Sequence, residues 1–375
     1  MIRALRPMIV KEFRQIRRDP TSLGMLLFLP AAIIVLVGYT LNFDVKHIPL
    51  AVYDQSGTPQ SRDFLQTFKQ TEYFDLMFAA TSDEGIEELF RHNRAKVAIV
   101  IPPTFATELG AGKATHVQIL VDGADNTTAG QAVAYSAGLT TTYSARLVAQ
   151  AMMRRGVQQY EPIDFRPRVW YNPNLLSSSF LVPGLIGFII VLTCVVSTSL
   201  TVVREKERGT MEQIMVSPLR PVEVILGKLI PYMLIGLIAA TVVIVLGYIL
   251  FGVHVAGSLS LLYGALFILI VGALGQGLLI STITDSQQVA FMISIFSSLL
   301  PSFLLSGFVF PISNMPIVLQ IASNVAVNKF FLVIVRGIML KGVGFLQLWD
   351  QFVYMSIFAL VMIGISSKRM QKRTL

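Results

Sequence analysis

The 375-residue chain is 54% hydrophobic and 14% charged, with a mean hydropathy of +0.65. This composition excludes an ordinary soluble globular protein and indicates a polytopic membrane protein. The net charge of +8 does not imply a nucleic-acid partner, because it is unevenly placed: residues 43–178 hold 12 basic and 14 acidic residues, and residues 311–350 hold three and one. These two regions together are neutral, so the whole excess lies in the other segments. The positive-inside rule puts those segments, with both termini, in the cytosol.

Residues 1–22 are predicted to form a cytosolic interface helix. Apolar residues recur at spacings of three and four, and basic residues fill the remaining positions. This pattern is typical of an amphipathic helix over residues 2–18 that lies on a membrane surface. The apolar positions are Ile2, Leu5, Ile9, Phe13 and Ile16. Asp19 and Pro20 then start a first span over residues 23–41. A secretory signal peptide is disfavoured, because no small-residue cleavage pattern follows the apolar run.

Residues 42–179 have the composition of a soluble domain. Strands are predicted over residues 48–53, 96–101, 116–122 and 166–171, and helices over residues 61–71, 82–92 and 127–155. The alternation of strand and helix predicts an extracytoplasmic α/β domain inserted between the first two spans. The histidines of this region lack metal-ligand spacing and no catalytic constellation is visible, so we expect neither a metal site nor an enzyme. The single cysteine, Cys194, lies in an apolar run and excludes an intrachain disulfide.

Five further spans follow, giving six in all. The second covers residues 180–203, the third residues 224–251, the fourth residues 259–283 and the last residues 348–366. Lys228 of the third is expected to snorkel to the inner surface. The fifth apolar run, residues 289–311, is interrupted by Pro301 and Gly307, which predicts a span followed by a re-entrant segment. Re-entrant and outer helices are therefore expected within residues 300–347, with Lys329 and Arg336 turned to water or headgroups.

Weakly polar side chains recur along the second and fifth spans. Thr193, Ser197 and Thr201 repeat every four residues, and Ser294, Ser298 and Ser302 do the same. Small residues of this kind let helices approach closely in lipid, so a packing seam is one interpretation. A face that lines a translocation path is the other.

Residues 204–223 are predicted to form a cytosolic hairpin, because six charges between Arg204 and Glu212 cannot lie in lipid. Gly209 breaks the preceding helix, Thr210 can cap the next, and Gln213 can complete a capping box. A short helix held at the membrane surface suits docking into a groove on a cytosolic partner. An ordinary polar loop is the alternative. The chain has no P-loop and no ionisable residue deep in a span, so energy for any transport must come from another polypeptide.

The run from Arg204 to Gln213, with Ser217-Pro218-Leu219 after it, resembles the coupling-helix region of type-2 ABC exporter permeases. Trp170-Tyr171-Asn172-Pro173 and Leu305-Ser306-Gly307 resemble the bacterial multidrug branch of that family. The likeness covers essentially the whole chain. It implies an all-α, six-span permease fold with the inserted α/β domain.

The resemblance also implies a function in the bacterial inner membrane. The chain would be the permease of an ATP-driven exporter for a drug-like or lipophilic substrate. Its partners would be a separate ATPase that binds ATP and Mg²⁺, a second permease chain (identical or a close paralogue), membrane lipid and a candidate periplasmic adaptor; this chain would bind no cofactor itself. By analogy, coupling to the ATPase falls on Glu205, Glu207, Arg208, Gly209, Thr210, Glu212 and Gln213. The translocation path would be lined by Thr193, Ser197, Thr201, Ser294, Ser298 and Ser302.

A function of another class stays open at this point. The chain could be a membrane-anchored surface receptor or an assembly scaffold whose α/β domain binds a partner. The interrupted fifth run and the capped hairpin disfavour this function, because an anchor requires neither.

Overall fold

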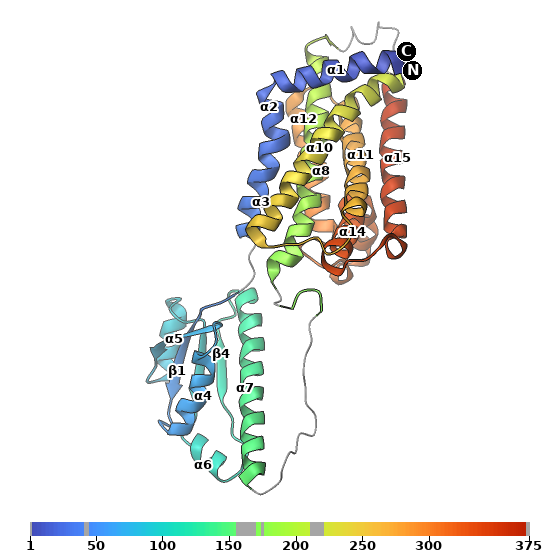
Figure 1. The fold of residues 1–375 in the computed structure, drawn as a ribbon. Coiled ribbons are helices and arrows are strands. Elements are labelled where there is room, and N and C mark those ends of the chain that lie inside the picture. Colours follow the sequence, from blue (N-terminus) through green and yellow to red (C-terminus); the bar gives the residue numbers. More distant parts are fainter. Residues whose placement is uncertain (1, 41–44, 155–169, 174–175, 211–220, 373–375) are drawn as a thin grey trace. The chain divides into compact units, whose positions relative to one another are not determined.

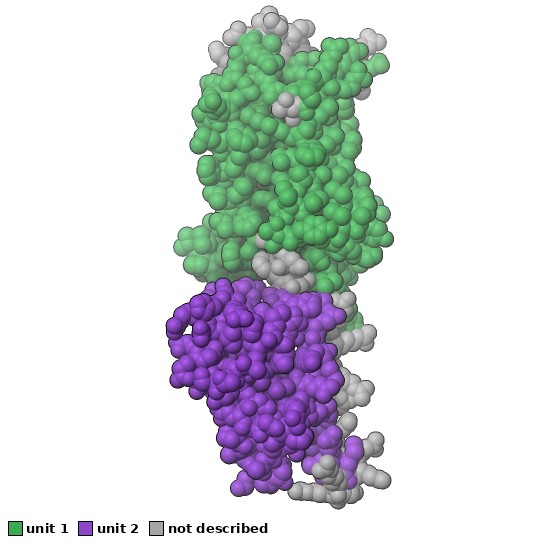
Figure 2. Space-filling view, turned by 90° about the vertical axis from the view of Figure 1, so that its left-hand side faces the viewer, with its two compact units in different colours: residues 1–42, 169–375 green, residues 43–168 purple. Residues whose placement is uncertain are grey.

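The computed structural model describes residues 2–40, 45–154, 170–173, 176–210 and 221–372. The chain folds into two compact units, residues 1–42 with 169–375 (unit 1) and residues 43–168 (unit 2), which Figure 2 shows in different colours. Unit 1 is helical and unit 2 contains a β-sheet (Figure 1). Each unit has its own hydrophobic core.

Unit 2 is built on a four-stranded sheet with the strand order β2-β1-β3-β4. The central strand β1 runs parallel to β2 and β3, and β4 runs antiparallel to β3. The strands are β1 (Ile48–Asp54), β2 (Phe74–Ala79), β3 (Val97–Ile101) and β4 (Gln118–Val121). Three were predicted, whereas β2 was missed. This edge strand exposes Leu76 and Met77, so its sequence lacks the in–out alternation of a half-buried strand.

Helices cover both faces of this sheet. Alternate strand residues point to opposite faces, so Leu50 packs with the aromatic side chains of one core while Ala51 packs against Ile86 on the other. The helices are α4 (Pro59–Lys69), α5 (Asp83–Arg91), α6 (Phe105–Gly110) and α7 (Asn126–Arg154). The predicted α/β class is therefore present. Most of the predicted strand at residues 166–171 lies outside the described residues, and its last two residues, Trp170 and Tyr171, are not in a strand.

Unit 1 begins with a helix that lies across one end of a bundle (Figure 1). This helix, α1 (Ile2–Arg18), has the predicted bounds. It buries Met8 and Ile16, whereas Phe13 of the predicted apolar stripe is exposed. The buried face of α1 therefore differs from the predicted apolar stripe. It is set by packing against the helix that contains Gly227, which Met8 approaches. The next segment consists of α2 (Pro20–Leu23), the π-helical η1 (Gly24–Phe28) and α3 (Leu29–Thr40).

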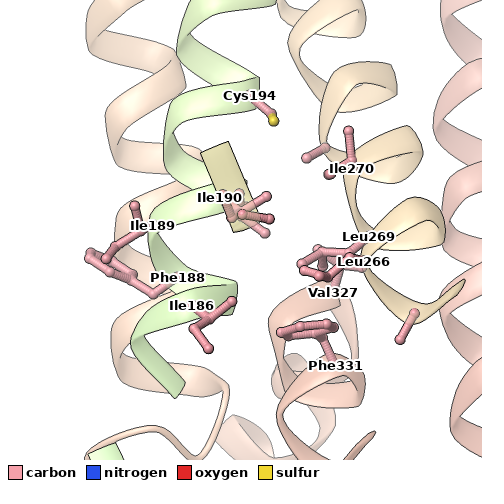
Figure 3. Packing of buried hydrophobic residues seen from close by; sticks show 14 of the residues in the cluster. Ile186, Phe188, Ile189, Ile190, Cys194, Leu266, Leu269, Ile270, Val327 and Phe331 are labelled. Carbon is pink, nitrogen blue, oxygen red and sulfur yellow. The ribbon is translucent and has the colours of Figure 1, made fainter. Parts of the chain in front are cut away.

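The long helix α8 (Ser177–Glu207) is the core of the bundle. In the most apolar 18-residue stretch of α8, 83% of the residues are buried. The corresponding share is 33% for α10 (Pro221–Phe251) and 22% for α15 (Trp349–Lys372). Figure 3 shows its side chains packed opposite Leu266 and Ile270 of α11 (Leu259–Ile283) and Phe331 of α14 (Val327–Lys341). Helix α14 approaches α8 closely at Gly187. A Cβ added to this glycine would lie only 2.2 Å from Oδ1 of Asn328, so a larger residue would not fit without a shift.

The interrupted fifth run is bent, as its proline and glycine predict. Helix α12 (Gln287–Leu300) passes into the π-helical η2 (Pro301–Leu305), and Gly307 takes a φ of +82°. Then η3 (Ile312–Asn314), α13 (Ile317–Ala322) and η4 (Ser323–Val325) lead to α14, with a bend of 85° before it. A short turn, η5 (Phe345–Gln347), precedes α15. Helix α14 is largely buried in the bundle, so this segment returns into the protein.

Lys329 and Arg336 of α14 were expected to face water or headgroups. Lys329 is partly exposed, and its ammonium donates to Ser323 Oγ at 2.9 Å and to Asn324 Oδ1 at 2.8 Å. The Arg336 guanidinium lies 3.6 Å from the ring centroid of Phe180 and donates to the carbonyl of Gly307 at 3.2 Å. Both cations are thus used to satisfy polar groups at the bends.

The described residues contain five helices long and apolar enough to cross a membrane: Ser177–Glu207, Glu223–Phe251, Leu259–Ile283, Gln287–Leu305 and Trp349–Arg369. The apolar helix Gly24–Thr40 is shorter, and the bent pair containing α14 could count as one more. The chain is therefore a multi-pass membrane protein, and the count of six spans stays a prediction.

Candidate functional site

The charged end of α8 is the centre of the candidate site. The helix continues through Arg204 to Glu207, four residues beyond the predicted end of the second span. Gly209 ends it with a φ of +68°, a left-handed conformation that glycine adopts without strain. The Thr210 hydroxyl donates to the carbonyl of Glu205 at 3.2 Å, so it caps the end of α8. The predicted capping box with Gln213 lies outside the described residues.

A cluster of two lysines and two glutamates joins this end of α8 to α1 and α10. Glu205 accepts a hydrogen bond from Lys11 of α1 at 2.8 Å and another from Lys228 of α10. The Lys228 ammonium also lies 3.2 Å from Glu12 Oε1, and Lys11 lies 3.4 Å from the same atom. We call Lys11, Glu12, Glu205 and Lys228 the ion cluster.

The ion cluster is buried and its formal charges balance. The side chains of Glu12, Glu205 and Lys228 are 0%, 4% and 3% exposed, and only Lys11, at 43%, reaches solvent. Burial alone would lower the pKa of Lys11, but the hydrogen bonds and charges of Glu205 and Glu12 outweigh it and raise that pKa above its ordinary value. Buried charges persist only when they are paired in this way, because each loses its hydration.

The burial of Lys228 corrects the expectation that it snorkels to the surface. Its long side chain is directed at two carboxylates that other helices supply, so water is not needed to solvate it. Glu12 was not recognised from the sequence. The available signal was its place between Met8 and Ile16, four residues from each, which puts it on the buried face of α1.

The last turn of α8 is also hydrogen-bonded to the turn between α11 and α12. Lys206 donates to the carbonyl of Thr284 at 3.3 Å and to Asp285 Oδ1 at 3.3 Å. Glu207 Oε1 accepts from the backbone N–H of Gln287 at 2.7 Å. Because Gln287 is the first residue of α12, this carboxylate satisfies a donor that the helix leaves unpaired.

Arg204 links α8 to the start of the first apolar helix. Its guanidinium forms an ion pair with Asp19, which directly precedes α2, and its Nε donates to Gln287 Oε1 at 3.3 Å. One helical turn, Arg204 to Glu207, therefore contacts α1, α10, α12 and the residue before α2. A displacement of this turn would be transmitted to each of them.

The structure brings five of the seven predicted coupling residues to this end of α8: Glu205, Glu207, Arg208, Gly209 and Thr210. Glu212 and Gln213 lie outside the described residues. The contacts identify further residues that the motif did not indicate. These are Lys11, Glu12, Asp19, Lys228 and Gln287.

The six predicted path residues are all buried within the chain. Thr201 is hydrogen-bonded to the Tyr232 hydroxyl at 2.8 Å, and Ser294 to Ser199 at 2.6 Å, so they join α8 to α10 and α12. Thr193 donates to the Ile189 carbonyl at 2.8 Å within its own helix. Thr201 and Ser294 thus take part in helix packing, and the assignment of the six residues to a translocation path stays a prediction.

Ser298 and Ser302 also border a cavity. They line a cavity of about 380 Å³, bounded by α11, α12, α15 and the segment that begins α14. The other lining groups are mostly apolar, and Gln276 supplies an amide that donates to the Ser297 carbonyl at 3.2 Å. This cavity suits an apolar molecule with few hydrogen-bonding groups.

A bundle of long apolar helices whose charged end is cross-linked by ion pairs is consistent with a membrane permease. The comparisons agree with this class: the family model described as "ABC-2 family transporter protein" matches residues 21–368. The chain thus belongs to the ABC-2 transporter family and is a permease subunit of an ABC transporter.

Relatives in Escherichia coli (strain K12) cover nearly the full chain. The "Probable multidrug ABC transporter permease YbhS" is 30% identical over 373 residues, which is 99% of this chain and 97% of the relative. The "Probable multidrug ABC transporter permease YbhR" is 30% identical over 351 residues, 93% of each. The "Inner membrane transport permease YhhJ" is 25% identical over 355 residues, 92% of this chain and 90% of the relative.

Proposed function

We propose that this chain is the permease of an ATP-driven exporter that moves a lipophilic or drug-like substrate out of the cytosol or the inner leaflet. ATP and Mg²⁺ bind to a separate cytosolic ATPase, and a second permease chain completes the transporter. Both termini and the end of the bundle that carries α1 face the cytosol. The observation that carries the proposal is the connection of one turn of α8 to three other helices and to Asp19, the residue before α2.

Coupling follows from these contacts. Closure of the ATPase displaces the segment 204–223, and the last turn of α8 moves with it. The ion cluster carries the displacement to α1 and α10, while Glu207 and Arg204 carry it to α12 and to the start of α2. Packed helices switch between discrete arrangements rather than deforming continuously, so the bundle passes from one packing to another.

The choice of an apolar substrate is supported by the cavity next to Ser298 and Ser302, whose lining is mostly apolar. The names of the Escherichia coli relatives, two of which are called probable multidrug permeases, agree with it. Ser298 and Ser302 are therefore the predicted path residues that we place nearest to the substrate. The remaining four would respond to it through helix packing.

The test is reconstitution of the chain with its candidate ATPase in liposomes, followed by measurement of ATP hydrolysis with and without the permease. We expect a stable complex and stimulated hydrolysis. The variant Glu207→Ala should still assemble but lose most of the stimulation, because it no longer holds Gln287. The matched control is Glu88→Ala, which changes an exposed glutamate of unit 2. If no ATPase associates with the folded chain, the proposal fails, and binding of a partner by unit 2 becomes the function to test.

A further inference from the structure

A basic hollow lies beside the ion cluster. It has a volume of about 860 Å³ and is formed where α1, the start of α2, the end of α8 and the start of α12 meet. We call it the basic hollow. Its lining residues are Lys11, Arg14, Gln15, Arg18, Asp19, Pro20, Arg204, Arg208 and Gln287.

The basic hollow has a large excess of positive charge. Five cationic side chains line it, against the single carboxylate of Asp19, which is paired with Arg204. Arg14, Arg18 and Arg208 form no ion pair within the part of the chain that the structure describes, and all three are exposed. Guanidinium groups that converge from two helices can bind the oxygens of a phosphate with charge-assisted hydrogen bonds.

Exposed apolar side chains lie near the basic hollow. On α1, the exposed Val10 and Phe13 lie beside the face that carries Arg14 and Arg18, and they share their own face with the exposed Arg6 and Arg17. Val10 and Phe13 are spaced by three residues, as are Lys11 and Arg14, so the two rows run side by side along the helix. A molecule bound to the cations can therefore contact apolar surface at the same time.

The helices that leave the basic hollow continue this apolar surface. From Pro20, the first apolar helix leads to the exposed Phe28. From Gln287, α12 leads to the exposed Val289, Met292 and Phe296, at spacings of three and four residues that place them on one face. An anionic group above two apolar helix surfaces is the arrangement that a phospholipid requires.

We propose that the basic hollow binds one anionic glycerophospholipid of the leaflet that faces this end of the bundle. Its phosphate contacts Arg14 and Arg18 of α1 and Arg208 of α8, and its acyl chains lie on the exposed side chains of α12 and the first apolar helix. A soluble acidic partner would use the charge but would leave these apolar surfaces uncovered, which is why we assign the hollow to lipid. The bound phosphate bridges α1 and α8, so it reinforces the same connection as the ion cluster.

The test is native mass spectrometry of the delipidated full-length chain, titrated with phosphatidylglycerol or with phosphatidylcholine of the same acyl length. We expect one phosphatidylglycerol to bind about tenfold more tightly than phosphatidylcholine. The variant Arg14→Gln/Arg18→Gln should lose this preference. The matched control Arg6→Gln/Arg17→Gln removes the same charge from the same helix, at exposed positions outside the hollow, and should keep it. Circular dichroism checks that both variants remain folded.

Three results would overturn the proposal. Equal losses in both double variants would mean that lipid responds to the charge of α1 in general. If inorganic phosphate displaced the lipid at the same concentration at which phosphate binds to the lipid-free protein, the basic hollow would be a site for a free anion, without acyl contacts. The basic hollow would be assigned to the ATPase if two results came together. The ATPase would displace the lipid, and the Arg14→Gln/Arg18→Gln variant in phosphatidylcholine nanodiscs would bind the ATPase more weakly than the native chain does.

Discussion

Replacing Lys228 by methionine tests whether the ion cluster holds the bundle together. The substitution keeps most of the side-chain length but removes the cation that contacts Glu205 and lies 3.2 Å from Glu12. The two carboxylates then share only Lys11, at 2.8 and 3.4 Å. Removing one partner of a buried ion pair costs about 3–5 kcal/mol, because a desolvated charge is left uncompensated. We expect a loss of that size in the free energy of unfolding, measured by titrating detergent-solubilised protein with dodecyl sulfate.

The control is Lys46→Met, which removes an exposed lysine whose ion pair with Glu72 is 2.9 Å long. An exposed pair contributes about 0–1 kcal/mol, so this variant should unfold almost as the native chain does. In the double variant Lys228→Met/Glu205→Gln the uncompensated charge on α8 is gone, so the combined loss should be smaller than the sum of the single losses. The reasoning is refuted if Lys228→Met lowers the free energy of unfolding as little as Lys46→Met does. It is also refuted if the loss in Lys228→Met/Glu205→Gln equals the sum of the losses in the Lys228→Met and Glu205→Gln single variants.

Three further predictions concern other parts of the molecule. Gly187→Leu should destabilise the protein and slow transport, because the new side chain would displace α14. The control Gly264→Leu should have little effect on stability or transport, because no atom lies within 4 Å of a Cβ at Gly264. Thermal unfolding and transport assays compare the two variants. The hydrogen bond from Lys96 lowers the pKa of Asp122, so this contact stabilises unit 2 above about pH 4, the ordinary range of aspartate, and the stability is lost as the pH falls through the folded-state pKa. Hydrogen exchange of β3 and β4, corrected for the intrinsic effect of pH, should show this loss in the native chain and not in Asp122→Asn. Ser298→Phe should fill part of the 380 Å³ cavity and reduce export without preventing ATPase binding, which drug accumulation and co-purification measure separately.

The helices and strands were largely predictable because their signals are local. The amphipathic pattern of residues 2–18 gave the bounds of α1, and Pro301 with Gly307 indicated the interruption of the fifth run. The edge strand β2 was missed because one of its neighbours is solvent, which leaves its side chains free to vary. The helix α8 continues four residues past Val203, the predicted end of the second span. The charges that follow are paired with other helices, so the helix need not end where its apolar residues do.

The candidate site was predictable only in part. Gly209 could be recognised from the sequence, since a helix end in a left-handed conformation favours glycine over other residues. The partners of Glu205 could not, because Glu12 and Lys228 are 193 and 23 residues away in the sequence. Lys228 is ordinary for a residue near the end of a span, and only the approach of α1 and α8 turns it into a buried ion-pair partner.

The sequence by itself determined the membrane class of the chain, the insertion of an α/β unit after the first apolar helix and the position of the charged segment after α8. Each follows from hydropathy, periodicity or a local turn, which depend on neighbours along the chain. Only the tertiary structure decided that α8 is the central helix, that α1 buries Glu12, and that cations from α1 and α8 surround one hollow. These features depend on which faces of distant helices meet, and a single sequence carries no direct signal of that choice.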